Sequence, residues 1–514
     1  MRNTILVLMT CLVLASTATA DVKLPSIFGS HMVLQRDREL TIWGWADAGE
    51  SVTVEIAGQS KQTKADAKGN WKVTIDPLKV GNPLILRVTG KNTIELSDIL
   101  VGEVWICSGQ SNMAWTVRRS DNADREIASA SHPRIRLITV PRAVADSPQP
   151  DFRGRWEICS PDTVADFSAV GFFFGRELEK HLNVPIGLIN TSYGGTPADA
   201  WTSRDALEAV EDFKPLLAEW DRRVKEITPE SVQQRNQEAL DRWKAAAAKA
   251  KADGKDAPPR PRPERAPQDH PHRPASLYNA MLAPLVPLEV AGAIWYQGES
   301  NCPRADQYRK LFPAMIADCR QAFGQKEMPF LFVQLAPFRY TRNPKQWCAE
   351  LWDAQLHTLK TVPRTGMAIT TDIGDVKDIH PTNKQEVGRR LSLWARATVY
   401  GEKDLAFSGP IYASKASVGD AIRIRFHHDK GLKSRDGKPL THFTIAGKDH
   451  LFHPATATIE GESIVVRSEK VKEPVAVRFA WEDDAEPNLV NGAELPASPF
   501  RTDDLPLTTA GRKF

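Results

Sequence analysis

The segment Val104-Trp-Ile-Cys-Ser-Gly-Gln-Ser-Asn-Met113 decides the fold class of this chain. The apolar run 104–107 leads directly to the small, polar turn 109–113. An apolar run that stops at such a turn is typical of a strand buried in an α/β sheet, where functional groups gather at the strand ends. Ser111 would lie at that end, beside backbone N–H groups that stabilise negative charge. Taken alone the pentapeptide is a weak motif, because polar turns follow many strands.

The overall composition sets limits on the class of protein. The chain has 514 residues, which predicts two to four domains, and its 41% hydrophobic and 25% charged residues are typical of a globular protein. Its net charge is only +3. So small a charge argues against a nucleic-acid partner and against binding to an anionic membrane surface.

Residues 1–20 are predicted to be a signal peptide. Arg2 precedes the apolar run 5–14, and Ala18-Thr-Ala20 fits the small-x-small cleavage rule, so Asp21 is expected at the mature N-terminus. The protein is therefore expected to be secreted or periplasmic. No later run reaches 18 apolar residues, so no membrane span is expected. The sequence does not indicate an oligomeric state.

Five cysteines remain after cleavage, and their spacing matches neither a zinc site nor a dense disulfide framework. A single bridge between Cys302 and Cys319 stays open as a hypothesis, whereas Cys107 is expected to pack as a small buried side chain. Neither a metal nor another cofactor is expected.

Changes of pattern along the chain predict three domains after the signal peptide. Residues 21–98 contain short runs with period-two alternation and read as a β-sandwich-like domain. Residues 99–404 alternate strands with helices, which predicts a parallel sheet covered by helices. Residues 405–514 return to short β-like runs.

An insertion, 205–275, interrupts the α/β domain. Its first part predicts surface helices, and its Pro-rich stretch 251–274 is expected to be an extended, solvated linker. No aromatic residues lie between 251 and 277 to stack on bases.

Three later segments add further polar groups at strand ends. The run 186–190 leads to Gly194 and Gly195, and adjacent glycines let a backbone N–H approach a ligand closely. The run 293–296 leads to Gln297, whose carboxamide can donate to an oxyanion, and to Glu299. The run 367–371 leads to the third segment, 372–385.

That third segment, Asp372-Ile-Gly-Asp-Val-Lys-Asp-Ile-His-Pro-Thr-Asn-Lys-Gln385, supplies His380. A histidine titrates near neutrality, so it can accept the serine proton and return it to a leaving group. Asp375 and Asp378 lie close in sequence, and a carboxylate would orient the imidazole.

Together these residues carry a family resemblance. GQSNM, NTSYGGTPADAW, WYQGESN and DIHPTNKQEVGRRL resemble the blocks of the SGNH-hydrolase superfamily, and most closely those of the sialate O-acetylesterase family. The opening LPSIFGSHMVLQRD and WGWADAGESV are also similar to that family. The resemblance implies a flavodoxin-like three-layer α/β/α core, no metal, and hydrolysis of O-acetyl esters on sugars.

The resemblance also implies roles for individual residues. Ser111 would be the nucleophile and His380 the general base, and the N–H groups of Ser111 and of Gly194 or Gly195 would form the oxyanion hole. The superfamily usually adds an asparagine to that hole, and the matching loop here offers Gln297.

The third member of the triad is less well defined. The superfamily often places an aspartate three residues before the histidine, where this chain has Lys377, so Asp378 is the candidate to orient His380. Glu299 and Asp375 remain alternatives.

Two competing functions stay open. The same site would suit an acetylated polysaccharide such as acetylxylan. A sialate site would need a cation for the substrate carboxylate, and the candidates are Arg118, Arg119, Arg339 and Arg342. A catalytically inactive carbohydrate-binding protein is the alternative of another class, and the presence of both Ser111 and His380 argues against it. Aromatic rings that would stack on sugars, or pack in the core, are Trp115, Tyr193, Trp201 and Trp295.

Overall fold

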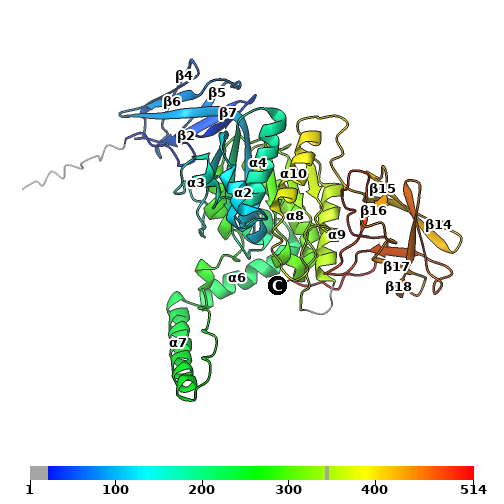
Figure 1. Ribbon diagram of the computed structural model, residues 1–514. Coiled ribbons are helices and arrows are strands. Elements are labelled where there is room, and N and C mark those ends of the chain that lie inside the picture. The colour runs from blue at the N-terminus through cyan, green and yellow to red at the C-terminus, as the bar shows by residue number, and fades with distance from the viewer. Residues whose placement is uncertain (1–20, 342–345, 514) are drawn as a thin grey trace, which may run out of the picture.

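The computed structural model describes residues 21–341 and 346–513. The predicted signal peptide and Arg342 lie outside the described residues. Figure 1 shows a central α/β body between two β regions, with a helical arm that projects away from it.

One sheet forms the centre of the body. Its strands lie in the order β13-β12-β11-β7-β10-β8-β9, and every neighbouring pair is parallel except β8 and β9. The strands span Thr93–Gly109 (β7), His132–Thr139 (β8), Glu157–Cys159 (β9), Ile186–Ser192 (β10), Gly292–Tyr296 (β11), Phe330–Val333 (β12) and Thr365–Ala368 (β13). Counted in chain order, β10-β7-β11-β12-β13 run 2-1-3-4-5, the order of a doubly wound sheet that binds ligands beyond its carboxyl ends.

Helices cover both faces of this sheet, which explains why its strands are apolar on both sides. Trp105 contacts Phe174 of α4 (Ala169–Leu182) with ring centroids 5.0 Å apart. On the other face, Ile106 shares a small cavity with Met315 of α8 (Ala305–Ala322). α10 (Lys384–Thr398) packs against α4, and α9 (Trp347–Thr361) packs against α8. Parallel strands enclosed in this way are buried along their whole length.

β7 continues beyond the core and joins it to the N-terminal β region. Its first half pairs antiparallel with β6, and its second half pairs with β10 and β11. The predicted boundary between 98 and 99 therefore falls inside one continuous strand. The N-terminal strands are β1 (Val33–Gln35), β2 (Leu40–Trp45), β3 (Ser51–Ile56), β4 (Gln59–Lys64), β5 (Asn70–Ile75) and β6 (Leu84–Thr89).

The C-terminal part forms two four-stranded antiparallel sheets and one short pair, and it is anchored on the core. Buried Glu350 of α9 accepts hydrogen bonds from the hydroxyls of Thr508 (2.7 Å) and Thr509 (2.6 Å). The strands are β14 (Ile411–Val418), β15 (Ala421–His427), β16 (Lys433–Ser434), β17 (Phe443–Ala446), β18 (Phe452–Pro454), β19 (Thr456–Glu460), β20 (Ser463–Arg467), β21 (Ala476–Phe479), β22 (Leu489–Val490) and β23 (Phe500–Arg501).

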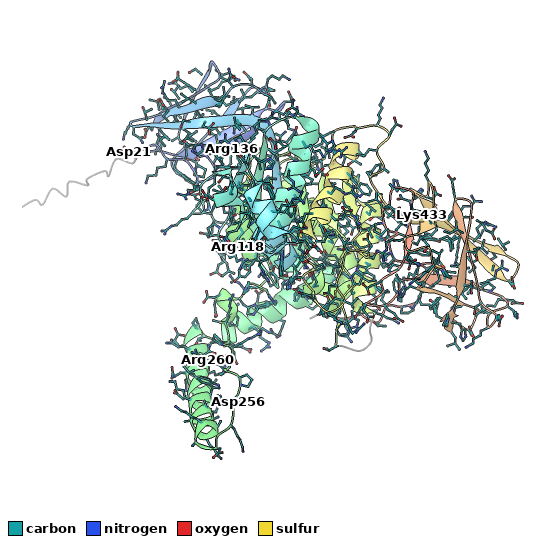
Figure 2. All side chains as sticks on the ribbon, viewed as in Figure 1. Asp21, Arg118, Arg136, Asp256, Arg260 and Lys433 are labelled. Atoms are coloured by element: carbon teal, nitrogen blue, oxygen red, sulfur yellow. The ribbon has the colours of Figure 1, made fainter. Side chains whose placement is uncertain are left out.

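The first part of the insertion contains the helices α5 (Arg204–Glu208), α6 (Lys214–Glu226) and α7 (Pro229–Ala252). α7 projects away from the core, and Figure 2 shows Asp256 and Arg260 on the stretch that follows it, also away from the core. The chain then returns along α7 without regular structure, where Trp243 Nε1 donates to the Pro258 carbonyl (2.8 Å).

The end of this Pro-rich stretch differs from the extended linker that the sequence predicts. Arg265 Nη1 donates to the Tyr193 hydroxyl (2.8 Å), and His270 is half-buried. Its own prolines and charges give no sign of this packing, because the partners lie on the distant core.

The five cysteines among the described residues are buried and form no disulfide with one another, so Cys302 and Cys319 form no bridge in this structure. Across the described ranges, no helix combines the length and the apolar character that crossing a bilayer requires.

Candidate active site

Ser111 stands where β7 ends and the one-turn helix α1 (Ser111–Ala114) begins. Gly109 makes this turn possible, because its φ is +141° and a Cβ there would lie 2.3 Å from the Tyr296 carbonyl oxygen. The Gln110 N–H donates to that same carbonyl (2.9 Å). The chain therefore leaves the sheet sharply and presents a partly exposed Ser111 at the carboxyl edge.

The turn after β10 lies directly against Ser111. A Cβ built on Gly194 would be 3.2 Å from the Ser111 Cβ, and the Tyr193 N–H donates to the Gly109 carbonyl (3.0 Å). In the part of the chain that the structure describes, the N–H groups of Ser111 and Gly194 donate to no protein acceptor. Both are thus available to an oxygen of a substrate. Gly195 is the next residue of the turn, with φ +75°.

His380 reaches the same edge from the loop between β13 and α10. Its ring stacks on Trp115, the residue that ends α1, with centroids 5.1 Å apart and an interplanar angle of 17°. The loop is fixed at its base, where buried Arg390 binds Asp372 at 2.6 Å. Among the described residues no hydrogen bond joins Ser111 to His380, and such contacts are often long before substrate binds.

Asp378 is the candidate carboxylate nearest to the imidazole. Its Oδ1 lies 3.7 Å from His380 Nδ1 and accepts the His380 backbone N–H at 2.9 Å. Asp375 instead accepts from the Lys377 N–H (2.8 Å) and closes its own turn. Glu299 accepts from Asn112 Nδ2 (2.6 Å) and has no recorded contact with His380.

Burial lowers the pKa of both basic groups near this loop. It lowers the pKa of His380 below its ordinary 6.5, while Asp378 opposes that shift. It also lowers the pKa of Lys384, which is completely buried at the start of α10, to about 7. His380 is therefore neutral, as a general base must be, down to mildly acidic pH.

Two residues that the sequence analysis did not single out connect the site. Buried Asn112 donates to Glu299 and to the Ile379 carbonyl (3.0 Å), and its Oδ1 accepts from Lys384 Nζ (2.6 Å). Burial raises the pKa of Glu299. This network joins the residue after Ser111 to the residue before His380. The signal for it in the sequence is faint: an amide directly after the serine and a lysine at the start of an otherwise amphipathic helix.

Gln297 is fully buried just past β11. Its Nε2 donates to the Thr196 carbonyl (3.2 Å) and to Asn301 Oδ1 (2.7 Å). The Tyr308 hydroxyl donates to its Oε1 (3.2 Å). Both amide hydrogens are therefore already used, and the side chain fixes the loop that follows Gly195.

The candidate cations differ in their surroundings. Arg118 pairs with Asp166 at 2.5 Å and Arg339 with Asp484 at 2.9 Å. The exposed Arg119 guanidinium instead lies 3.5 Å from the Trp115 ring centroid, and it has no recorded acidic partner among the described residues. It is thus a cation held close to His380.

Two of the four aromatic candidates lie in the core and two lie at the site. Trp201 and Trp295 are buried against each other, with centroids 6.0 Å apart, and belong to the core. Tyr193 and Trp115 border the site. Among the described residues no group of three or more His, Cys, Asp or Glu side chains is arranged to hold a metal ion.

Comparisons with known proteins place this geometry in a family. The sequence model described as carbohydrate esterase, sialic acid-specific acetylesterase matches residues 101–247 and 269–394. The sialate O-acetylesterase of Rattus norvegicus is 32% identical over 89% of this chain and 89% of its own, and that of Homo sapiens is 30% identical over 92% and 91%.

A solved structure is similar over almost the whole chain. A carbohydrate acetylesterase from Xanthomonas citri is 35% identical, with a TM-score of 0.80 over 94% of this chain and 100% of that one. The matched residues include Ser111, Gly194, Gln297 and His380. This chain belongs to the sialic acid-specific acetylesterase family of carbohydrate esterases, and it is a carboxylic ester hydrolase that removes O-acetyl groups from carbohydrates.

Proposed function

We propose that this protein is a secreted sialate O-acetylesterase with an SGNH-type three-layer core, in which Ser111 and His380 carry out acyl transfer. The observation that carries the proposal is that three segments meet at one edge of the sheet. Ser111 follows β7, and Gly194 lies against Ser111. His380 stacks on Trp115, the residue directly after α1. Separate elements supply a nucleophile, an anion site and a base, which are the parts that acyl transfer requires.

In the first step the Ser111 hydroxyl attacks the acetyl carbonyl while His380 accepts its proton. The N–H groups of Ser111 and Gly194 bind the oxyanion of the tetrahedral intermediate. His380 then returns the proton to the sugar oxygen as the C–O bond breaks, which leaves acetyl-Ser111. Water activated by His380 attacks this ester, and acetate and free Ser111 are formed.

Asp378 is the proposed orienting group because it is the candidate carboxylate nearest to His380. The network of Asn112, Glu299 and Lys384 would hold the nucleophile turn and the histidine loop at a fixed spacing. Gln297 would act on the oxyanion hole indirectly, by fixing the turn that contains Gly194.

Arg119 favours a sialate over a neutral sugar. Its guanidinium is stacked on Trp115, and Trp115 is stacked on His380, so a positive charge lies near the proposed general base. A carboxylate on the substrate would bind there. An acetylated neutral polysaccharide such as acetylxylan has no such group and is the second candidate substrate.

The division into 21–98, 99–404 and 405–514, with β7 running through the first of these limits, belongs to the same proposal, as does export by residues 1–20. Export would be checked by sequencing the N-terminus of the mature protein, which is expected to begin at Asp21.

The substrate is tested by comparing O-acetylated sialic acid with an acetylated xylo-oligosaccharide, for the wild type and for Arg119→Gln. We expect Arg119→Gln to lower kcat/KM for the sialate by about tenfold, because a charged hydrogen bond contributes roughly 1.5–3 kcal/mol. The kcat/KM for the neutral substrate should change by less than about twofold. Preference of the wild type for the xylo-oligosaccharide would contradict the sialate assignment.

A further inference from the structure

A second cavity lies between the core and the insertion, and the turn that borders Ser111 leads into its wall at Pro197. It has a volume of about 360 Å³. Its walls include Pro197, Ser300 and Arg304 from the core, Trp220 and Arg223 from α6, and His272 from the returning Pro-rich stretch. An acetyl group needs only about twice the ~30 Å³ that one water molecule occupies, so this cavity is far larger than an acyl pocket requires.

The insertion holds the same turn that borders Ser111. The His272 ring donates to the Gly195 carbonyl, and Arg265 donates to the Tyr193 hydroxyl (2.8 Å). Pro197 follows two residues after Gly195 and lines the cavity. One wall of the cavity and the turn beside the nucleophile are thus parts of one connected structure.

Buried polar groups form the floor. Arg304 pairs with Asp199 at 2.7 Å, and their side chains are only 9% and 1% exposed. Arg304 Nη1 also donates to Gln307 Oε1 (2.7 Å). Because a buried charge is tolerated only when it is paired, this floor is fixed in place and offers a constant pattern of polar atoms to a ligand.

Aromatic groups, Trp220 and His272, form another part of the lining. The half-buried Trp220 ring contacts His270 with centroids 5.5 Å apart, and His270 contacts His272 at 4.7 Å. The Arg223 guanidinium lies 5.5 Å from the Trp220 centroid. A cavity lined by both an aromatic ring and fixed polar groups suits a sugar ring, which has apolar C–H faces and a polar rim.

We propose that this cavity is a subsite for the sugar unit linked to the acetylated one, and that the insertion makes the enzyme selective for longer glycans. The inference rests on the proposed role of Ser111, since the turn that borders this nucleophile at Gly194 continues into the cavity wall at Pro197. Trp220 is the specificity-determining residue, and His272 positions the turn that contains Gly195.

The test compares an O-acetylated monosaccharide with the oligosaccharide that carries it, using free O-acetylated sialic acid and O-acetylated sialyllactose. In the wild type the oligosaccharide should have the lower KM. Trp220→Ala should raise the ratio of the oligosaccharide KM to the monosaccharide KM by about tenfold, because one stacked ring is lost. The matched control is Trp243→Ala, a tryptophan of the same insertion that packs on Pro258 along the arm, and its ratio should equal that of the wild type.

Equal KM values for the two substrates in the wild type would overturn the proposal. An unchanged ratio of the two KM values in Trp220→Ala would also overturn it. This includes the case in which both KM values rise equally, since that result would indicate a structural role only. A separate measurement detects failure of the proposed function. If Ser111 is not the nucleophile, Ser111→Ala would still hydrolyse p-nitrophenyl acetate, and this outcome does not depend on the KM ratio of Trp220→Ala.

Discussion

The reactivity of Ser111 depends on its immediate neighbours more than on its own side chain. Gly109 allows the sharp exit from β7, and Gly194 leaves room for an oxygen next to the nucleophile. The aligned backbone N–H groups act only if that space stays open, because oxyanion donors must lie at hydrogen-bond distance from the developing charge.

Gly194→Ala tests this space. The new methyl group would lie 3.2 Å from the Ser111 Cβ and 3.8 Å from the Ser111 nitrogen, and so would crowd the proposed oxyanion hole. We therefore expect kcat to fall by about 10²-fold with little change in the melting temperature. Initial rates with p-nitrophenyl acetate give the answer. Gly81→Ala is the matched control, since a Cβ there meets nothing within 4 Å. Equal kcat in the two variants would argue against a hole at Gly194.

His380 should determine the acid limb of the pH profile. Catalysis requires the neutral imidazole, and burial lowers the His380 pKa, so kcat/KM should rise with pH to a plateau with a midpoint below 6.5. Asp378 raises that pKa, so Asp378→Asn should move the midpoint to still lower pH while reducing kcat. A midpoint above 6.5, or an unchanged midpoint in Asp378→Asn, would contradict these assignments.

Asn112→Ala should weaken both stability and turnover. The substitution leaves the Glu299 carboxylate and the Lys384 ammonium without a shared partner, which costs about 3 kcal/mol by the usual size of hydrogen bonds to charged groups. Urea unfolding measures the loss. Because Asn112 and Lys384 share one network, the double variant Asn112→Ala/Lys384→Met should lose less than the sum of the single variants, and strict additivity would exclude the coupling.

Among the elements of the fold, the buried strands were the most predictable from the sequence. The runs that become β7, β10 and β11 are apolar because helices cover both faces of the sheet, and each ends in a recognisable turn. The meeting of Ser111, Gly194 and His380 follows from this parallel arrangement. The contacts of Asn112 with Lys384, and of Arg265 with Tyr193, join residues 272 and 72 positions apart, and local periodicity carries no information about such pairs.

The attachment of the C-terminal segment to α9 is expected to contribute to stability. Thr508 and Thr509 donate through both hydroxyl and backbone N–H to the buried Glu350 carboxylate. Thr508→Ala/Thr509→Ala removes two of these four donors and should lower the free energy of unfolding by about 2–4 kcal/mol. Thr361→Ala, which removes an exposed hydroxyl bonded within α9, should have a far smaller effect in the same urea titration.

In the whole molecule, stability rests on the packed core and on buried polar networks, without cross-links among the described residues. All five cysteines there are buried and form no disulfide with one another. Burial raises the pKa of Cys107 and Cys319 and so suppresses their thiolate forms. A thiol reagent should therefore label no cysteine in the native mature protein and all five after denaturation, and reductant should not change the melting temperature. A reductant-dependent melting temperature would reveal a disulfide and contradict the structure.

Acetate release by the Ser111→Ala variant is the most direct test of the proposed mechanism. Ser108→Ala is the matched control, because it removes a hydroxyl from the same strand, β7. This hydroxyl is buried and has no hydrogen-bond partner among the described residues. The proposed mechanism predicts that Ser111→Ala loses acetate release from O-acetylated sialic acid by at least about 10³-fold, while Ser108→Ala retains wild-type activity. Comparable rates in the wild type and in Ser111→Ala would show that another group performs the attack, and the assignment of Ser111 as nucleophile would be wrong.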